Sequence, residues 1–224
     1  MEIIIISIGT LSKNPFWREK QPVRTSHATT TLIRRDDDLL LVDPSLPAVP
    51  LEARLYERAG IKLDAITHVF LTNWRPVHRR ALAALPQATW WLSEAEQEAA
   101  DQALMEALNR ADGNAEAEKL IREEQSLLRK TTPAPDELLD GVDLFPLPGY
   151  TPGQCGLLLT EPTRTTLLAG DAVPTAAHFL AGQVFQEAWD IDKAKDSLME
   201  MYEIADLIIP GHDNLFPTPR AAAM

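Results

Sequence analysis

The chain has 224 residues, 45% of them hydrophobic, which is enough to bury a sizeable core. Its formal net charge of -12 repels phosphate backbones, so we expect no nucleic-acid partner. Cys155 is the one cysteine, which excludes an intramolecular disulfide, and no stretch approaches the roughly 20 apolar residues of a membrane span, so we expect a cytoplasmic protein with no membrane contact.

The first part of the chain alternates between strand and helix patterns. Apolar runs rich in β-branched residues predict strands, at 2–8, 27–35, 38–44, 64–72 and 88–93. Leucines at helical spacing predict short helices, at 50–60 and 78–85. The charged turn RDDD between the second and third strands favours a hairpin.

Residues 93–130 form an acid-rich segment with apolar residues at helical spacing. Ser93 is typical of a helix N-cap, and Glu96 three residues later predicts a capping box. Gly113 and Asn114 interrupt the pattern, so we expect two helices. The pair is interpreted as a solvated helical hairpin packed on the body, and the alternative is a surface that binds a partner.

After a linker at 131–137, the pattern of strands and helix returns. Strands are predicted at 142–148, 155–160, 165–170 and 206–213, with a helix at 190–205. The two halves of the chain are therefore similar in their order of elements. This similarity favours a sandwich of sheets with helices outside, in a single domain over 1–224 with the helical insertion at about 93–130.

Polar turns follow several of these apolar strands, in the segments TNWRPVH (72–78), PGYTPGQ (148–154), GD (170–171) and PGHD (210–213). Loops at strand ends carry sites because the sheet holds their backbones while their side chains stay free. We expect the four segments to converge.

The same segments resemble the motifs of the metallo-β-lactamase superfamily. LTNWRPVH is similar to its Thr-His-x-His-x-Asp-His signature, PGYTPGQ to its Pro-Gly-His-Thr-Pro-Gly-His loop, LLAGDAV to its Gly-Asp turn, and LIIPGHD to its terminal histidine loop. LLLVDPSL matches the strand that ends in Val-Asp. The order and spacing agree from about residue 27 to residue 216. The resemblance implies an α/β fold, a four-layer αββα sandwich.

By this resemblance, the first metal of the family would be held at Asn73, Arg75 and Tyr150, and no imidazole remains at these positions. Arginine has donors but no lone pair, so it cannot be a ligand. We expect Arg75 to replace the lost cation and to pair with Asp171. Together with Asn73 and Tyr150, it would then bind a small polar or anionic ligand.

The second metal would be held at Val77, His78 and His212, with Asp171 as the bridging carboxylate. The aspartate of this set is lost at Val77, but two imidazoles and one carboxylate remain. Such a set can hold one ion with open positions, so His78, Asp171 and His212 are the candidate ligands of one metal at most.

Three functions follow from these observations. The first is a protein of this fold that has largely lost its dinuclear site, has no cofactor, and either lacks catalysis or binds a small polar or anionic ligand. The second is a mononuclear hydrolase of esters, thioesters, lactones or phosphodiesters with one zinc, iron or manganese ion, in which Tyr150 is a proton donor or an oxyanion partner. The third is an interaction protein that uses the helical pair at 93–130. The sequence leaves open whether the chain is an enzyme, and the resemblance implies a homodimer as the oligomeric state to consider.

The remaining histidines and aromatic residues are interpreted as structural. His68 is expected to be a packed histidine in its strand, and His178 is expected in a surface loop, with the mouth of the pocket as the alternative. Trp74 is expected to border the pocket, and Asp43 to order a loop. Cys155 begins an apolar strand and is expected to be buried.

Overall fold

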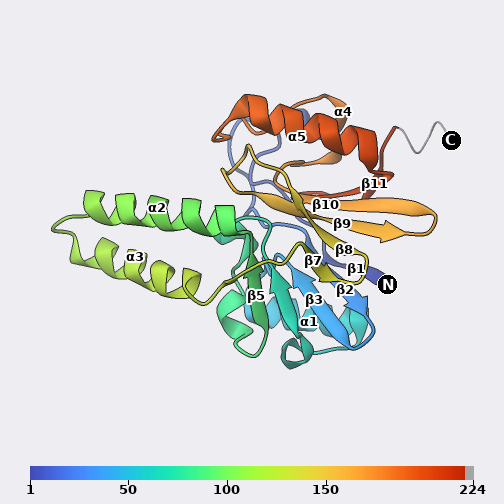
Figure 1. Ribbon diagram of the computed structural model, residues 1–224. Helices are drawn as coiled ribbons and strands as arrows, with labels where there is room; N and C mark the ends of the chain where they lie inside the picture. The colour runs from blue at the N-terminus through green and yellow to red at the C-terminus, as the bar shows by residue number, and fades with distance from the viewer. Residues whose placement is uncertain (220–224) are drawn as a thin grey trace.

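The computed structural model describes residues 1–219, in which two sheets stack face to face between helices (Figure 1). The first sheet has the order β1-β2-β3-β4-β5-β6, and its strands are Glu2–Ser7, Thr30–Arg35, Asp38–Val42, His68–Phe70, Thr89–Leu92 and Thr132–Pro133. The first three strands are antiparallel, as the predicted hairpin requires, and β3 to β6 run parallel.

The second sheet has the order β12-β11-β10-β9-β8-β7. In chain order its strands are Glu137–Leu139, Val142–Pro146, Cys155–Glu161, Arg164–Gly170, Leu207–Pro210 and Phe216–Pro217. β10 and β11 are parallel, and the other neighbours are antiparallel. Both sheets are therefore mixed.

Helices cover the outer faces of both sheets. The α-helices are α1 (Ala48–Ala59), α2 (Glu94–Arg110), α3 (Ala115–Leu128), α4 (Ala176–Leu180) and α5 (Ile191–Ile204). In Figure 1, α1 lies below the first sheet and α5 lies above the second. The expected four-layer αββα sandwich is confirmed. No helix in residues 1–219 has the length and apolarity needed to cross a membrane.

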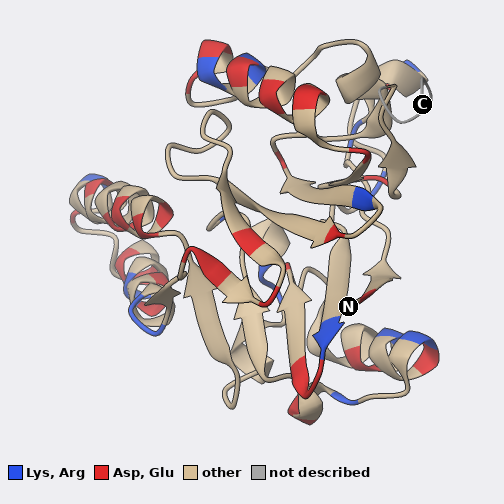
Figure 2. Ribbon diagram, turned by 45° about the vertical axis from the view of Figure 1, so that its right-hand side comes forward, with Lys and Arg blue, Asp and Glu red and all other residues tan. Residues whose placement is uncertain are grey.

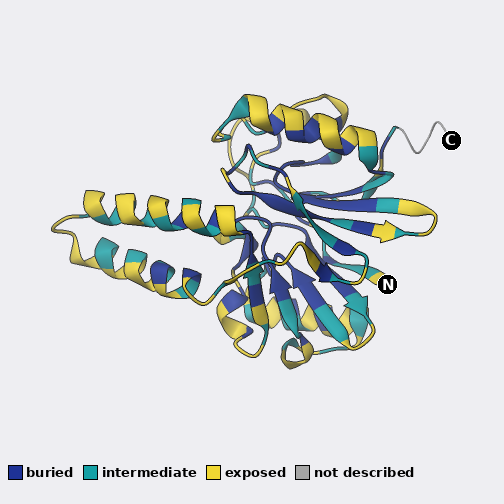
Figure 3. Cartoon of the chain, viewed as in Figure 1, coloured by how far each residue is buried: buried dark blue, intermediate teal, exposed yellow. Residues whose placement is uncertain are grey.

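Alternation along the strands decides which layer each apolar side chain enters. Leu40 packs between the two sheets, while its neighbour Leu41 packs against α1. Leu168 likewise packs between the sheets, and Leu167 packs against α5. Successive residues of a strand point to opposite faces, so one apolar run serves two buried layers. Figure 3 shows the strands largely buried and the outer helix faces exposed.

The predicted helical pair at 93–130 is present as α2 and α3. Ser93 Oγ accepts the backbone N–H of Glu96 at 3.1 Å, and Asn114 Oδ1 accepts that of Ala117 at 3.1 Å. The two helices project away from the sheets as a hairpin (Figure 1), and their exposed faces are rich in acidic residues (Figure 2). The pair is anchored at its base, where Ala100 and Leu128 join the core beside α1.

Several predicted elements differ from the structure. The helix expected at 78–85 is wrong. One 3₁₀ turn, Pro76–His78, ends where this stretch begins, and a second, Leu82–Ala84, lies within it. The N–H of Ala81 donates to the carbonyl of Pro44 at 3.0 Å instead of to the preceding turn, so a tertiary bond replaces the helical one. The strand expected at 64–72 is shortened to β4, and the linker contributes β6.

Candidate functional site

The four loops that follow apolar strands lie against one another. The N–H of Gly211 donates to the carbonyl of Gly170 at 2.8 Å, and the N–H of Cys155 donates to the carbonyl of Thr72 at 3.1 Å. A Cβ at Gly211 would lie 2.6 Å from Asp171 Oδ1, so only glycine allows this close approach. The end of β10 and the end of β11 are thereby held in contact.

Two histidines from different loops face one buried carboxylate. His78 Nε2 lies 2.8 Å from Asp171 Oδ2, and His212 Nε2 lies 3.0 Å from Asp171 Oδ1. All three side chains are buried, and the candidate ligand atoms lie within 4.8 Å of one another. The structure thus brings together the three residues that the sequence suggests as metal ligands.

The outer nitrogen of each imidazole is held by a fixed acceptor. His78 Nδ1 lies 2.9 Å from Asp43 Oδ2, and that carboxylate also accepts the N–H and hydroxyl of Thr72 at 3.0 and 2.8 Å. His212 Nδ1 donates to the carbonyl of His27 at 2.9 Å. Acceptors of this kind set the orientation and tautomer of metal-binding histidines. Asp43 therefore orders the loop, as expected, and also orients His78.

These contacts test whether an ion suits the site. A carbonyl oxygen only accepts, so His212 Nδ1 carries a proton, and Nε2 is the nitrogen of this ring left for an ion. Asp171 Oδ1 is buried and has no hydrogen-bond partner, because its 3.0 Å contact with His212 Nε2 lacks hydrogen-bond geometry. A buried carboxylate oxygen without a hydrogen bond, within 4.8 Å of two imidazole nitrogens, is a donor set that fits one cation.

The charges of the cluster are strongly coupled. Burial lowers the pKa of His78, but the carboxylates of Asp171 and Asp43 outweigh burial and raise it to about 10. Burial would raise the pKa of Asp171, yet the imidazoles of His78 and His212 hold that pKa well below its usual range. Without an ion, His78 is therefore protonated at neutral pH and faces the carboxylates of Asp171 and Asp43, and a bound cation would take the place of the proton on Nε2.

The expected pairing of Arg75 with Asp171 is wrong. Arg75 is exposed, its guanidinium carbon lies 5.3 Å from the centre of the Tyr150 ring, and it forms no ion pair within residues 1–219. Asn73 instead reaches Asp171, with Nδ2 3.4 Å from Oδ2. Burying a guanidinium is costly when the carboxylate already has imidazole partners, whereas stacking on Tyr150 keeps it in water.

Tyr150 borders a cavity of about 640 Å³ that opens onto the cluster. The cavity is also lined by Val77, Asp171, His212 and Phe185. Burial and the charge of Asp171 raise the pKa of the Tyr150 phenol, and the nearby Arg75 only partly opposes them. The phenol therefore stays protonated at neutral pH and can donate a hydrogen bond into the cavity.

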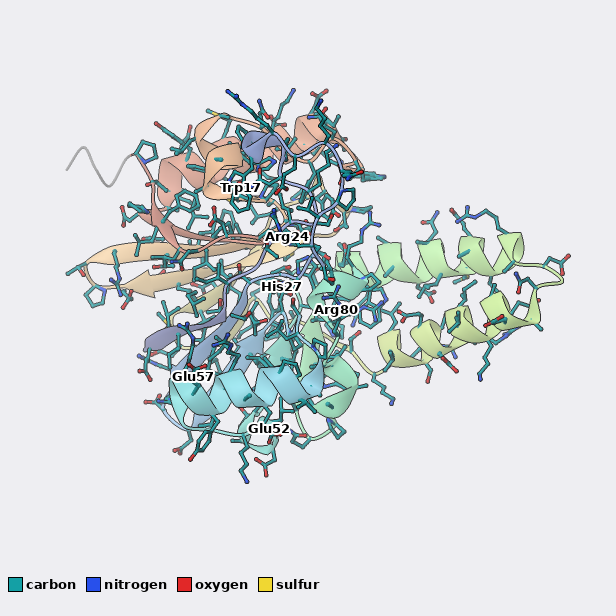
Figure 4. The ribbon with its side chains drawn as sticks, turned by 180° about the vertical axis from the view of Figure 1, so that it is seen from behind. Trp17, Arg24, His27, Glu52, Glu57 and Arg80 are labelled. Carbon is teal, nitrogen blue, oxygen red and sulfur yellow. The ribbon has the colours of Figure 1, made fainter. Side chains whose placement is uncertain are left out.

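A segment from the N-terminal part of the chain covers the other side of this cavity. It contributes Leu11, Lys13 and Ser26 to the lining. Figure 4 shows the segment from behind, with Trp17 and Arg24 labelled on it, and the guanidinium carbon of Arg24 lies 4.8 Å from the centre of the Trp17 ring. The cavity is thus bounded by protein on both sides of the cluster.

Two residues beside the site have arrangements that the sequence did not predict. His178 lies in α4 and is buried, so the surface loop expected for it is wrong. The Thr-x-x-His spacing from Thr175, which caps α4, was a signal for a helix start. The Glu96 carboxylate does not complete a capping box but accepts bonds from Trp74, Thr151 and Gly153.

The interpretations of His68 and Cys155 hold, whereas that of Trp74 is wrong. His68 is a packed residue that stacks on Trp91 with ring centres 4.3 Å apart, and Cys155 is buried. Trp74, expected to border the pocket, lines a separate cavity of about 440 Å³ beside α2.

Comparison with known protein families identifies the family of the chain. The family model described as the metallo-beta-lactamase superfamily matches residues 23–212. The chain belongs to the metallo-β-lactamase superfamily. No curated protein matches the chain significantly.

Solved structures of the superfamily share this fold. A Thermotoga maritima protein, named as a candidate metallo-beta-lactamase, is 20% identical with a TM-score of 0.68, over 96% of this chain and 98% of its own. AidC, a dizinc quorum-quenching lactonase in complex with a homoserine product, is 17% identical with a TM-score of 0.67, over 88% and 76%. A B. thuringiensis AiiA mutant with N-decanoyl-L-homoserine at its active site is 19% identical with a TM-score of 0.63, over 94% and 92%. At these identities, the likeness shows the fold alone.

Proposed function

We propose that the chain is a metal-dependent hydrolase that holds one divalent ion with His78, Asp171 and His212. The observation that carries this proposal is the buried Asp171 Oδ1, which lies 3.0 Å from His212 Nε2 without hydrogen-bond geometry. The fixed partners of both imidazoles at Asp43 and at the His27 carbonyl support it. A single zinc, iron or manganese ion is the cofactor we expect.

The replaced ligands limit the site to one ion. Arg75 offers only donors and points away over Tyr150. Asn73 offers a neutral amide, whose Oδ1 already accepts the N–H of Arg75 at 2.9 Å. The positions of the first metal in the superfamily therefore carry no donor set of their own in this chain.

The substrate that suits the cavity is a small ester, thioester or lactone. A divalent ion, when bound, lowers the pKa of a water and polarises a carbonyl group. Tyr150 supplies a protonated phenol that donates to the carbonyl oxygen as negative charge develops on it. The neighbours AidC and AiiA carry homoserine products at their sites, which favours the carbonyl substrates over phosphodiesters.

Metal binding is tested first by stoichiometry. The chain is stripped with a chelator, loaded with zinc, iron or manganese, and analysed for metal per chain. We expect close to one ion in the wild type and far less in Asp171→Asn and His212→Ala. His68→Gln, a histidine outside the cluster, is the matched control and keeps the wild-type value. A wild-type ratio well below one at metal excess contradicts the proposal.

Activity is tested on a panel of esters, thioesters and lactones with the loaded protein. We expect turnover that disappears in Asp171→Asn and persists in His68→Gln. Turnover that is equal in the stripped and loaded wild type would show that the reaction does not use this site.

A second candidate is a non-catalytic protein that binds a small polar or anionic ligand. Its support is Arg75, a cation without an ion pair within residues 1–219, beside Tyr150 at the edge of the site. Under this proposal, the loaded wild type turns over no member of the panel but binds acetate or citrate in calorimetry. Arg75→Ala loses that binding, and Arg80→Ala, an exposed arginine of the same loop, keeps it.

A further inference from the structure

His178 is a buried histidine that shares the cavity of the metal cluster. It lies in α4, which begins five residues after Asp171, and its exposed fraction is 4%. The cavity of about 640 Å³ is lined by His178 together with Tyr150, Asp171 and His212. No part of the proposed function above uses this imidazole.

The ring of His178 is held at one nitrogen and free at the other. Nδ1 lies 2.7 Å from Thr175 Oγ1, which also accepts the backbone N–H of His178 at 3.3 Å. A hydroxyl oxygen has two lone pairs and can accept both N–H groups. Nε2 has no hydrogen-bond partner within residues 1–219. In the tautomer with the proton on Nδ1, Nε2 therefore carries a free lone pair beside the cavity.

Aromatic packing fixes the plane of the ring, and burial favours its neutral form. Phe16 meets it edge-on with ring centres 4.8 Å apart, and Phe185 lies 6.1 Å away. Burial lowers the pKa of His178, the nearby His212 lowers it further, and Glu187 only partly opposes them. Lys13 and Tyr150 are the other titratable groups on this side of the cavity.

The other side chains beside the cluster are poorer proton acceptors than His178. Val77 stands where the signature has its aspartate, and Val77 lines the same cavity without any polar atom in its side chain. Asp171 faces both imidazoles of the cluster, and Tyr150 holds its proton at neutral pH. Glu187 also lines the cavity but is exposed, so His178, in the tautomer that leaves Nε2 unprotonated, is the buried base of this cavity.

We propose that His178 is a catalytic residue that carries the proton of the reaction, an assignment that rests on the proposed hydrolase function. As the oxygen of a water bonds to the substrate carbonyl carbon, the water loses a proton to Nε2. When the bond from that carbon to the leaving oxygen or sulfur breaks, Nε2 returns the proton to the leaving atom. The imidazole ends neutral, and one water is consumed for each ester, thioester or lactone bond cleaved.

The experiment compares His178→Gln, Thr175→Val and wild type as metal-loaded proteins on the substrate that the wild type turns over. We expect His178→Gln to lower kcat at least about 100-fold with an unchanged metal ratio, and to lose the acidic limb of the pH profile of kcat. Thr175→Val, a change in a positioning residue, gives a smaller loss, and Thr175→Ser restores the rate. Free imidazole partly rescues His178→Ala, because the deleted ring leaves room in the cavity.

The outcomes separate the two proposals. A wild type without turnover overturns the hydrolase function, and the role of His178 with it. A wild type with turnover, beside His178→Gln with the same kcat and the same pH profile, overturns the role of His178 alone. A fall in kcat that is matched by an equal fall in metal ratio also overturns it, because the residue would then act on the cluster and not on the proton. His68→Gln shows neither change.

Discussion

The carboxylate of Glu96 accepts a hydrogen bond of 2.9 Å from the backbone N–H of Trp74, 22 residues away in the sequence. The same carboxylate accepts the hydroxyl of Thr151 at 2.6 Å and the N–H of Gly153 at 3.2 Å. One buried side chain at the start of α2 therefore joins the loop after β4 to the loop after β8. The helical pair is thus connected directly to the candidate site.

Removing this carboxylate should destabilise the fold. Glu96→Ala leaves the N–H groups of Trp74 and Gly153 and the hydroxyl of Thr151 without their acceptor in a buried position. We expect the free energy of unfolding to fall by about 3 kcal/mol, as for other broken buried networks. Glu98→Ala, an exposed glutamate on the same helix, should change it by less than about 0.5 kcal/mol. Urea denaturation followed by circular dichroism measures both variants. Equal losses of unfolding free energy would contradict a stabilising role for the Glu96 carboxylate.

The ionisation of Glu96 should make stability depend on pH. Burial raises the pKa of Glu96 above its usual 4.5, although the bonds from Thr151, Trp74 and Gly153 act in the opposite direction. The folded chain then holds this proton to higher pH than the unfolded chain. The resulting contribution to the free energy of unfolding is fully present below pH 4.5 and is lost as the pH rises through the folded-state pKa.

Glu96→Gln has no titratable carboxyl at this position, so its comparison with the wild type isolates the effect of this ionisation on stability. We expect the free energy of unfolding of the wild type to decline relative to Glu96→Gln as the pH rises above 4.5. Denaturation curves at several pH values measure the difference. A difference that grows in favour of the wild type as the pH rises would reverse the sign assigned here.

The close contact between Gly153 and α2 predicts a sharp steric effect. A Cβ at Gly153 would lie 2.1 Å from the backbone nitrogen of Glu96, so Gly153→Ala must push the loop away from the helix. We expect a loss of at least about 3 kcal/mol in the free energy of unfolding. Gly113→Ala is the control, because Gly113 has a φ of +82° but open space around it, and the strain costs about 1 kcal/mol. Similar losses of unfolding free energy in both variants would contradict close packing of the Gly153 backbone against α2.

The phenol of Tyr150 should matter for turnover and not for metal binding. Tyr150→Phe removes the donor that faces the carbonyl oxygen of a substrate, so we expect kcat to fall about 100-fold while the metal ratio stays near one. Tyr56→Phe, an exposed tyrosine on α1, should leave kcat unchanged. Steady-state kinetics and elemental analysis of the two variants test this, and an unchanged kcat in Tyr150→Phe would remove the phenol from the mechanism.

Much of the architecture is readable from local patterns. Alternation such as Leu40 and Leu41 assigns neighbouring residues to opposite faces because it follows from strand geometry alone. The polar turns after apolar strands could be located in the same way, and their resemblance to the superfamily motifs identified His78, Asp171 and His212 as a set. The helix expected at 78–85 failed, because Ala81 bonds to Pro44 from a distant segment.

The direction of individual polar side chains could not be read in this way. The exposure of Arg75, the burial of His178 and the three bonds of Glu96 all depend on which loops the stacked sheets bring together. His78 and Asp171 are 93 residues apart, yet 2.8 Å separate their polar atoms. Periodicity along a chain reports local backbone geometry and burial, whereas the free energy of a buried charge depends on neighbours that only the packed layers supply.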